Sequence, residues 1–494
     1  MIAVPDEMTH LIDRAVIAIR EATNILAISH IDADGITAMA IVVEMLQREG
    51  KKHTWRNIHQ LNSETIITIQ DIVKEIKPDL IIFSDLGTGQ FHLIQEYLLG
   101  KNDVSKIIVL DHHLPSGERK DSTILLDDPN SIEINPCQHG LSGSSDISGA
   151  GVAFLVAYRL SPMNADLSEL AIVGATGDLQ RYYGKGFSGI NAEIIRIGSE
   201  ENHLLVEKDL TFFGINTRPL VQLLQYATDP YLPGITGNID ACYEFYADLG
   251  IELKAADDSW KCWVDLKQEE KQKIIQKLIG IILDSYDNPT VATGIVGNIV
   301  TLQNRPPRTE MRSAKEFSTL LNACGRNRRA EIGVEICLNN QEAFDEGKAL
   351  LQIHRRNLAL AIRRVESGGF EERPGMYLVN DPETQDTIIG IVIGMAQGSR
   401  IIPWDRPVIG VSTNTTDDRP LVKISGRAKK QVLNKGVNLK DIFSSVSEAL
   451  NKREGKLIAE AGGHPMAAGA FVHNDNLEEF LEHVSKELFE ILGI

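Results

Sequence analysis

Cysteine is scarce in this chain of 494 residues, with five at positions 137, 242, 262, 324 and 337. They are odd in number and scattered, and none forms a Cys-x-x-Cys pair, so neither a disulfide framework nor a zinc ribbon is indicated. No apolar run approaches the roughly 20 residues that span a bilayer. The N-terminus also lacks the basic region and apolar core of a secretory signal. We therefore predict a protein of the reducing cytoplasm with no membrane association.

Basic residues are outnumbered, because 50 Lys and Arg stand against 68 Asp and Glu, for a net charge of −18. This balance argues against non-specific binding of nucleic acid over the whole surface. It leaves room for a local basic groove, so the charge has to be considered segment by segment.

Apolar runs alternate with amphipathic stretches, and the length exceeds one ordinary domain. We predict an α/β protein in four parts. Residues 1–215 form a domain with a parallel sheet flanked by helices, and 216–305 form a helical inserted region. Residues 306–368 hold a basic segment and a long connecting helix, and 369–494 form a second α/β domain.

The stretch at residues 24–46 ends an apolar run with three side chains that bind metals well. A strand is predicted at 24–28 and a helix at 36–48, with His30, Asp32 and Asp34 between them and Gly35 at the turn. Alternate residues of a strand share one face, so we expect the three side chains to point the same way. Alone, such a triplet is more often a solvated turn that caps the helix.

Three further segments follow apolar runs in the same manner. They supply Asp85, then Asp111, His112 and His113, and finally Asp178. Alone, these residues could be a helix cap, loop histidines and a turn residue. Together they predict convergence on one edge of one sheet, where buried carboxylates need cations. Oxygen and imidazole ligands suit Mn²⁺, with Mg²⁺ as the alternative. The number of ligands exceeds the needs of one ion, so we predict two.

These motifs resemble a known family. "SHIDADG", "SDLG", "LDHH" and "GATGD" are similar to the four motifs of the DHH phosphoesterase superfamily. "ISGRA" (424–428) and "AGGHPMAAGAF" (461–471) resemble the substrate-binding motifs of its DHHA1 domain. "ATDPYLPGITG" and "EFSTLLNACGRNRRAEIGV" are most similar to archaeal RecJ-like nucleases, including the GINS-associated nuclease.

The resemblance implies roles for each group of residues. His30 and Asp32 would hold one metal, Asp34, His112 and Asp178 the other, and Asp85 would bridge both. Asp111 would orient a ligand histidine, and His113 would face the scissile phosphate. Ser425 and Arg427 would clamp a terminal phosphate, Gly462 and Gly463 would let the backbone approach the substrate, and His464 would contact a phosphate near the metals. Water activated between two metals would then attack phosphorus.

The leading hypothesis is an exonuclease that releases mononucleotides from single-stranded nucleic acid, with DNA and the 5′→3′ direction favoured. RNA and the 3′→5′ direction stay open, as does a nanoRNase or a phosphatase for adenosine bisphosphate. A scaffold that accompanies GINS, the MCM helicase or another RecJ-like chain is the non-enzymatic alternative.

Two regions would contact the substrate or a partner. The segment 220–300, in which Trp260 and Trp263 are expected to be exposed, is a candidate docking region. Basic side chains would line a groove for the strand, although a solvated face is an equal explanation for those of the long helix. They are Arg305, Arg308, Arg312, Arg326, Arg328, Arg329, Arg355, Arg356, Arg363, Arg364, Lys423, Arg427, Lys429 and Lys430.

Overall fold

The structure is a computed structural model that describes residues 2, 4–115, 129–180, 186–227, 230–285, 289–414 and 420–493. Thr228 and Asp229 of the "ATDPYLPGITG" stretch lie outside the described residues. The chain divides into two compact units, Met1–Leu351 (unit 1) and Gln352–Ile494 (unit 2). The division falls within one helix, α14 (Gln341–Gly368), and the four-part organisation stays a prediction. Within the described ranges, no helix is long and apolar enough to cross a membrane.

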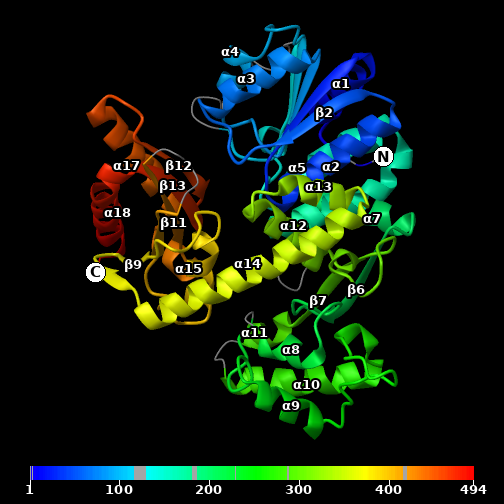
Figure 1. Cartoon of the computed structure of the whole chain (residues 1–494), viewed down its shortest axis with the longest axis vertical. Coiled ribbons are helices and arrows are strands. Elements are labelled where there is room, and N and C mark those ends of the chain that lie inside the picture. Colours follow the sequence, from blue (N-terminus) through cyan, green and yellow to red (C-terminus); the bar gives the residue numbers. More distant parts are fainter. Residues whose placement is uncertain are drawn as a thin grey trace. The chain divides into compact units, whose positions relative to one another are not determined.

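Unit 1 is built on a five-stranded parallel sheet, which confirms the predicted fold class (Figure 1). The strands lie in the order β2 (Lys52–Asn57), β1 (Asn24–Ser29), β3 (Leu80–Ser84), β4 (Lys106–Leu110) and β5 (Ser131–Ile134). β1, β3 and β4 are apolar and almost wholly buried, as expected for parallel strands covered on both faces.

Helices cover both faces of this sheet, and alternate strand side chains enter two different cores. Leu80 and Ile82 of β3 join the larger core, whereas Ile81 and Phe83 join the smaller one. The larger core includes α1 (Asp6–Glu21), α2 (Ala33–Arg48), α5 (Gly149–Leu160), α6 (Ser168–Gly177), α7 (Gly189–Glu200), α12 (Ala314–Arg326) and α13 (Ala330–Cys337). The smaller core includes α3 (Thr65–Ile76) and α4 (Phe91–Tyr97).

A helical insertion extends from a two-stranded antiparallel ribbon of β6 (Leu204–Leu210) and β7 (Val296–Leu302). It contains α8 (Leu220–Gln225), α9 (Ile239–Asp248), α10 (Gln268–Ser285) and α11 (Pro289–Gly294). The prediction of two exposed tryptophans is right for Trp260, which is 43% exposed, and wrong for Trp263, which is fully buried. Trp263 fills the core of the insertion, and its Nε1 donates to Asp209 over 2.8 Å.

Unit 2 holds a six-stranded mixed sheet in the order β12, β13, β11, β10, β9, β8. The strands are β8 (Glu371–Arg373), β9 (Met376–Asn380), β10 (Val408–Ser412), β11 (Leu421–Arg427), β12 (Ala459–His464) and β13 (Ala467–His473). One core contains α16 (Lys430–Leu433), α17 (Leu439–Glu454) and α18 (Leu477–Leu492), and the other contains α15 (Ile389–Gly398) and the end of α14. The α/β pattern predicted after Met376 is therefore present.

One buried ion pair connects α6 to the segment that precedes α12. Arg305 Nε lies 3.3 Å from Glu169 Oε2, and both side chains are about as buried as the surrounding core, at 6% and 5% exposure. α6 ends one residue before Asp178. The pair therefore helps to fix the helix that positions one of the predicted ligands.

Replacing Glu169 by Ala is expected to destabilise unit 1 by about 3 kcal/mol, because it leaves a buried guanidinium without its carboxylate. The matched control is Glu200→Ala, which removes a surface partner of Arg196 that is 60% exposed. That change should lower the free energy of unfolding by less than about 0.5 kcal/mol. Thermal and denaturant unfolding measure both, and equal losses for the two variants would contradict the assignment.

Candidate metal centre

The predicted ligands gather at the carboxyl edge of the parallel sheet, where β1, β3 and β4 end next to one another. Asp85 follows β3 directly, and its N–H donates to the carbonyl of Leu110 at the end of β4 over 2.8 Å. Its φ is +58°, a left-handed conformation that is uncommon outside glycine. The backbone at Asp85 is therefore held in a strained state that directs this carboxylate, which is 2% exposed, into the centre.

His30, Asp32 and Asp85 form one group. His30 Nδ1 lies 3.0 Å from Asp32 Oδ2 and 3.6 Å from Asp85 Oδ2. Their ligand atoms all lie within 4.8 Å of one another, a spacing that one cation can fill.

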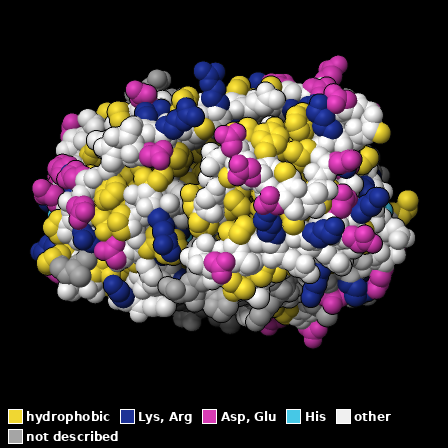
Figure 2. All heavy atoms as spheres, turned by 90° about the horizontal axis from the view of Figure 1, so that it is seen from below, with side chains coloured by type: hydrophobic (Ala, Val, Ile, Leu, Met, Phe, Trp, Pro, Cys, Tyr) yellow, Lys and Arg dark blue, Asp and Glu magenta, His cyan; other side chains and the backbone are white. Residues whose placement is uncertain are grey.

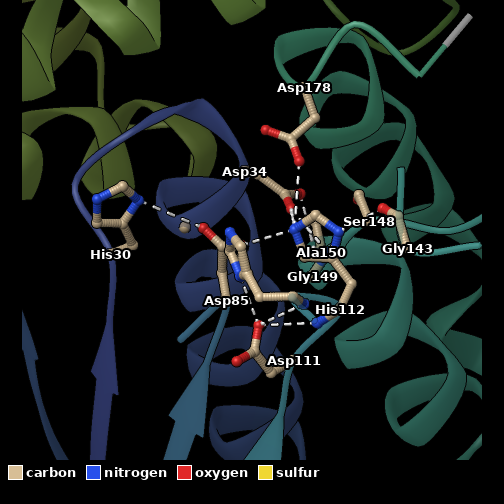
Figure 3. Close-up of polar contacts among 12 residues, drawn as sticks. His30, Asp34, Asp85, Asp111, His112, Gly143, Ser148, Gly149, Ala150 and Asp178 are labelled. Carbon is tan, nitrogen blue, oxygen red and sulfur yellow. Dashed lines mark hydrogen bonds and ion pairs between the residues drawn. The ribbon is translucent and has the colours of Figure 1, made fainter. Parts of the chain in front are cut away.

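Asp34, His112 and Asp178 form a second group of the same compactness (Figure 3). His112 Nε2 lies 3.5 Å from Asp34 Oδ2 and 3.2 Å from Asp178 Oδ2. It also lies 3.2 Å from Asp85 Oδ1, while the other Asp85 oxygen faces His30. Asp85 therefore presents one oxygen to each group, as a residue that bridges two cations must. Asp85, His112 and His113 satisfy the same distance criterion as a third set.

The start of α2 turns two of these carboxylates toward the site, and the explanation predicted from strand periodicity is wrong. β1 ends at Ser29, so Asp32 and Asp34 are not strand residues. Asp32 is the N-cap of α2 and accepts from Gly35 N over 3.0 Å. Asp34 lies in the first turn and accepts from Gly149 N over 2.6 Å and Ala150 N over 3.0 Å, at the N-terminus of α5.

The ring of His112 is fixed by a backbone carbonyl. Its Nδ1 donates to the Gly143 carbonyl over 2.6 Å, and the same carbonyl accepts from Gln180 Nε2 over 2.8 Å. A ring that donates through Nδ1 leaves Nε2 free to act as a metal ligand. Sequence analysis missed Gly143 and Gln180, because neither belongs to a run of ligand-type residues.

Asp111 holds the other histidine. This carboxylate is buried and accepts from His113 Nδ1 over 2.7 Å, His112 N over 2.8 Å and Thr88 N over 2.9 Å. Burial alone would raise its pKa, but the neighbouring His113 outweighs that effect and the pKa falls well below its usual value. Asp111 therefore orients the ring of His113. Its contact with His112 is to the backbone N–H and not to the ring.

Glycines bring the elements of the site close together. A Cβ at Gly149 would lie 2.7 Å from Asp85 Cβ and 2.8 Å from Asp85 Oδ1, and a Cβ at Gly174 would overlap Asp34 Oδ1. Neither position was predicted as a site residue, although Gly174 opens the "GATGD" motif. The available signal was small residues near the acidic motifs, at the start of α5 for Gly149 and in the last turns of α6 for Gly174.

The charges of the centre fit divalent cations. Asp85 Oδ2 and His112 Nε2 are buried, and neither has a hydrogen-bond partner. Burial, followed by repulsion from Asp85 and Asp178, raises the pKa of Asp34 well above its ordinary value. Burial and the Asp32 and Asp85 carboxylates raise the pKa of Asp178 to about 7. Crowded carboxylates with imidazole nitrogens suit Mn²⁺ or Mg²⁺, which would relieve this repulsion.

Helix α12 approaches the same loop from another direction. Asn322 Oδ1 accepts from Ala33 N over 3.1 Å, and a Cβ at Gly325 would overlap the Ile31 carbonyl. Arg326 follows directly and interacts electrostatically with Asp32. The structure therefore brings this predicted groove arginine to the metal centre.

Several other predicted groove arginines have partners within the chain, and for Arg305, which is 6% exposed, the prediction that it lines a groove is wrong. Arg305 is buried against Glu169, and Arg312 donates to the carbonyls of Gln303 and Arg305. Three more of the predicted arginines pair with acidic side chains: Arg308 with Asp265, Arg329 with Glu331 and Glu346, and Arg364 with Asp381. These pairs form across segments far apart or on adjacent turns, which the charge pattern alone does not show.

In unit 2, the two predicted substrate-binding motifs meet on one face of the sheet. Arg427 of β11 lies opposite Ala467 of β13, which lies opposite His464 of β12. Likewise, Ser425 of β11 lies opposite Gly469 of β13, which lies opposite Gly462 of β12. Gly463 follows Gly462 in β12 and has a φ of +127°. Residues directly opposite one another on paired strands share a face of the sheet.

Helix α15 packs closely on this face, and the site is cationic. A Cβ at Gly390 would lie 2.6 Å from Arg427 Nη2 and 3.3 Å from Ser425 Oγ. Lys423 shares the face, and burial together with Arg427 lowers its pKa to about 8 against the opposing effect of Asp386. Ser425, between these two cations on β11, is 5% exposed.

Comparison with known proteins agrees with this architecture. Residues 24–175 match the DHH family N-terminal domain, 212–291 the DHH-CID domain and 376–490 the DHHA1 domain. An uncharacterized protein of Methanocaldococcus jannaschii is 30% identical over 471 residues, which cover 95% of this chain and 93% of the relative. The chain belongs to the DHH family and carries a DHHA1 domain.

The chain is also similar to the single-stranded-DNA-specific exonuclease RecJ. The Bacillus subtilis protein is 25% identical over 289 residues, which cover 55% of this chain and 34% of RecJ. Among solved structures, RecJ of Thermus thermophilus in complex with Mn²⁺ shares the fold with a TM-score of 0.56 at 19% identity, covering 99% of this chain and 55% of that one. CDC45 of Entamoeba histolytica has a TM-score of 0.59 at 14% identity, covering 98% and 97%.

The close approach of α5 to Asp85 gives a first prediction for the site. Gly149→Ala should weaken Mn²⁺ binding by roughly ten- to a hundredfold, because the added methyl group displaces the shared carboxylate. Gly89→Ala is the matched control, since a Cβ there meets nothing within 4 Å. Isothermal titration calorimetry measures both. Unchanged affinity in the Gly149 variant would show that Asp85 is not a ligand.

The crowding of carboxylates gives a second prediction for the site. Asp85→Asn should raise the thermal unfolding midpoint in chelator, because it removes one charge from a repulsive cluster. The same variant should lose most of the stabilisation that millimolar Mn²⁺ gives the unchanged protein. Differential scanning calorimetry with and without Mn²⁺ checks both, and Asp71→Ala, at a surface carboxylate 68% exposed, serves as control. A variant that Mn²⁺ stabilises as well as the parent would contradict the metal assignment.

Proposed function

We propose that this protein is a Mn²⁺- or Mg²⁺-dependent exonuclease that hydrolyses phosphodiester bonds of single-stranded nucleic acid. The observation that carries the proposal is the pair of ligand groups, His30 with Asp32 and Asp34 with His112 and Asp178, on either side of Asp85. A scaffold protein has no need to retain such a strained and repulsive arrangement. The similarity to RecJ supports a strand of nucleic acid as the substrate.

Two bound cations would lower the pKa of water and neutralise charge on the phosphate. The chain's own residues supply orientation around them. The backbone donors at Gly149 and Ala150 hold the Asp34 carboxylate in place. His113, whose side chain is 45% exposed, is an accessible polar group of the centre. Burial lowers its pKa, but Asp111 outweighs that effect and the pKa lies above the ordinary value. As an imidazolium it would donate a hydrogen bond to a phosphate oxygen.

The cationic face of unit 2 would bind a phosphate of the substrate. Arg427 offers a planar fork of donors, and Ser425 and His464 offer further donors on the same face. Gly462 and Gly463 leave room for a close backbone approach. Recognition of a terminal phosphate here would make cleavage exonucleolytic, and a 5′ phosphate on DNA is the version we favour.

The surface charge favours a single strand held at local sites. On the face shown in Figure 2, basic and acidic side chains are interspersed with hydrophobic patches, and the basic ones do not gather into one band. With a net charge of −18, long-range attraction to duplex backbone is weak. Binding would therefore depend on the metal centre and on the face around Arg427.

A replication scaffold is the second candidate, because the fold is also that of CDC45. In that case the chain would bind partners of the GINS and MCM kind through regions such as the insertion. The complete ligand set favours the nuclease, and the two roles are compatible in one molecule.

Incubation with Mn²⁺ and single-stranded DNA or RNA, labelled at either end, tests the proposal. We expect stepwise release of mononucleotides from one end, lowered about a hundredfold or more in Asp85→Ala. Asp71→Ala should retain full activity, and strands with and without a 5′ phosphate report the polarity. Cleavage restricted to oligomers of a few nucleotides would favour a nanoRNase, and a lack of cleavage with retained partner binding would favour the scaffold.

A further inference from the structure

Leu179, the residue directly after Asp178, has an unusual conformation for its side chain. Its φ is +57°, in the left-handed region where a Cβ is sterically disfavoured. Its side chain is 79% exposed, so burial in a core does not explain the choice of leucine. A single exposed leucine is ordinary on a protein surface, but one held in a strained backbone is not.

The backbone requirement at this position is clear from its hydrogen bonds. Leu179 N donates to Thr176 O over 3.2 Å and Gln180 N to Ala175 O over 3.0 Å, which closes α6 in a Schellman arrangement. Glycine or asparagine is favoured at such positions because each adopts positive φ at low cost.

Other helices of this chain follow that preference. The same pair of hydrogen bonds closes helices at Gly50, Asn202, Gly250 and Asn339, each with positive φ. Arg328, at the end of α12, is a second exception with this arrangement. Its helix is the one whose Gly325 packs against the Ile31 carbonyl, next to the metal centre. Positive φ also occurs at Lys77, the C-cap of α3, whose carbonyl accepts from Asn24 at the opposite end of β1, so such strain is not confined to the centre. Leu179 differs because it directly follows the ligand Asp178, where contact with a substrate can compensate for strain.

A second exposed leucine directly follows another residue of the centre. Leu114 follows His113 directly and is 59% exposed. The two segments meet where His112 Nε2 approaches Asp178 Oδ2 at 3.2 Å. An exposed leucine therefore follows each of two residues of a site that is otherwise made of charged and polar groups.

We infer that Leu179 is a substrate-positioning residue whose side chain packs against the nucleobase next to the scissile phosphate. This inference rests on the proposed nuclease function and extends it. Every base offers an apolar face, so a leucine can hold the nucleotide without selecting sequence. The strained backbone at the end of α6 leaves this side chain exposed, one residue after the ligand Asp178.

Substitutions at Leu179 separate stability from activity. Leu179→Gly should raise the thermal unfolding midpoint in chelator by about 2 °C, because it relieves the strain. Its kcat/KM on single strands should fall about tenfold, chiefly through KM. Leu179→Met, which keeps an apolar side chain, should retain most of the activity. Asn202→Gly, at the equivalent position of α7, is the control and should leave activity unchanged.

A substrate without the base gives the decisive comparison. On a strand whose terminal nucleotides are abasic, the parent and Leu179→Gly should be cleaved at similar rates, because the contact is missing for both. Equal activity of the two on ordinary strands would overturn the inference while the nuclease assignment stands. A tenfold loss that persists on abasic strands would also overturn it. If the parent cleaves no strand, the proposed function and this inference both fail.

Discussion

The repulsion among buried carboxylates at the carboxyl edge of the unit 1 sheet is the constraint on which the rest of the site depends. Asp34, Asp85 and Asp178 converge on His112, so each negative charge disfavours the others. Such a cluster is unfavourable unless cations occupy it. Divalent metal ions would neutralise the repulsion among these carboxylates. The need to bind them is the physical basis of the proposed chemistry.

The surrounding elements hold the ligands in place against this repulsion. The left-handed backbone of Asp85, the N-terminus of α5 against Asp34 and the Gly143 carbonyl on His112 each fix one group. Glycines at 149 and 174 allow the helices to approach closely enough. In unit 2, a sheet face gathers Ser425, Arg427 and His464 from two distant motifs.

Much of this could be predicted from the sequence, because ligand-type side chains directly follow strong apolar runs. The strands that end before His30, Asp85 and Asp111 were expected, and so was the gathering of their motifs at one edge. The reason given for Asp32 and Asp34 was wrong, since helix capping rather than strand alternation orients them. The pairing of Arg305, the burial of Trp263 and the roles of Gly143 and Gly149 depend on contacts between distant segments, which local patterns do not encode.

The central claim is that Asp85 is shared by two metal ions, and anomalous diffraction from crystals grown with Mn²⁺ tests it most directly. The account predicts two anomalous peaks about 3.5–4 Å apart, one beside His30 and Asp32 and the other beside Asp34, His112 and Asp178. Asp85 should contribute one oxygen to each. A single peak, or two peaks that do not share Asp85, would contradict the account.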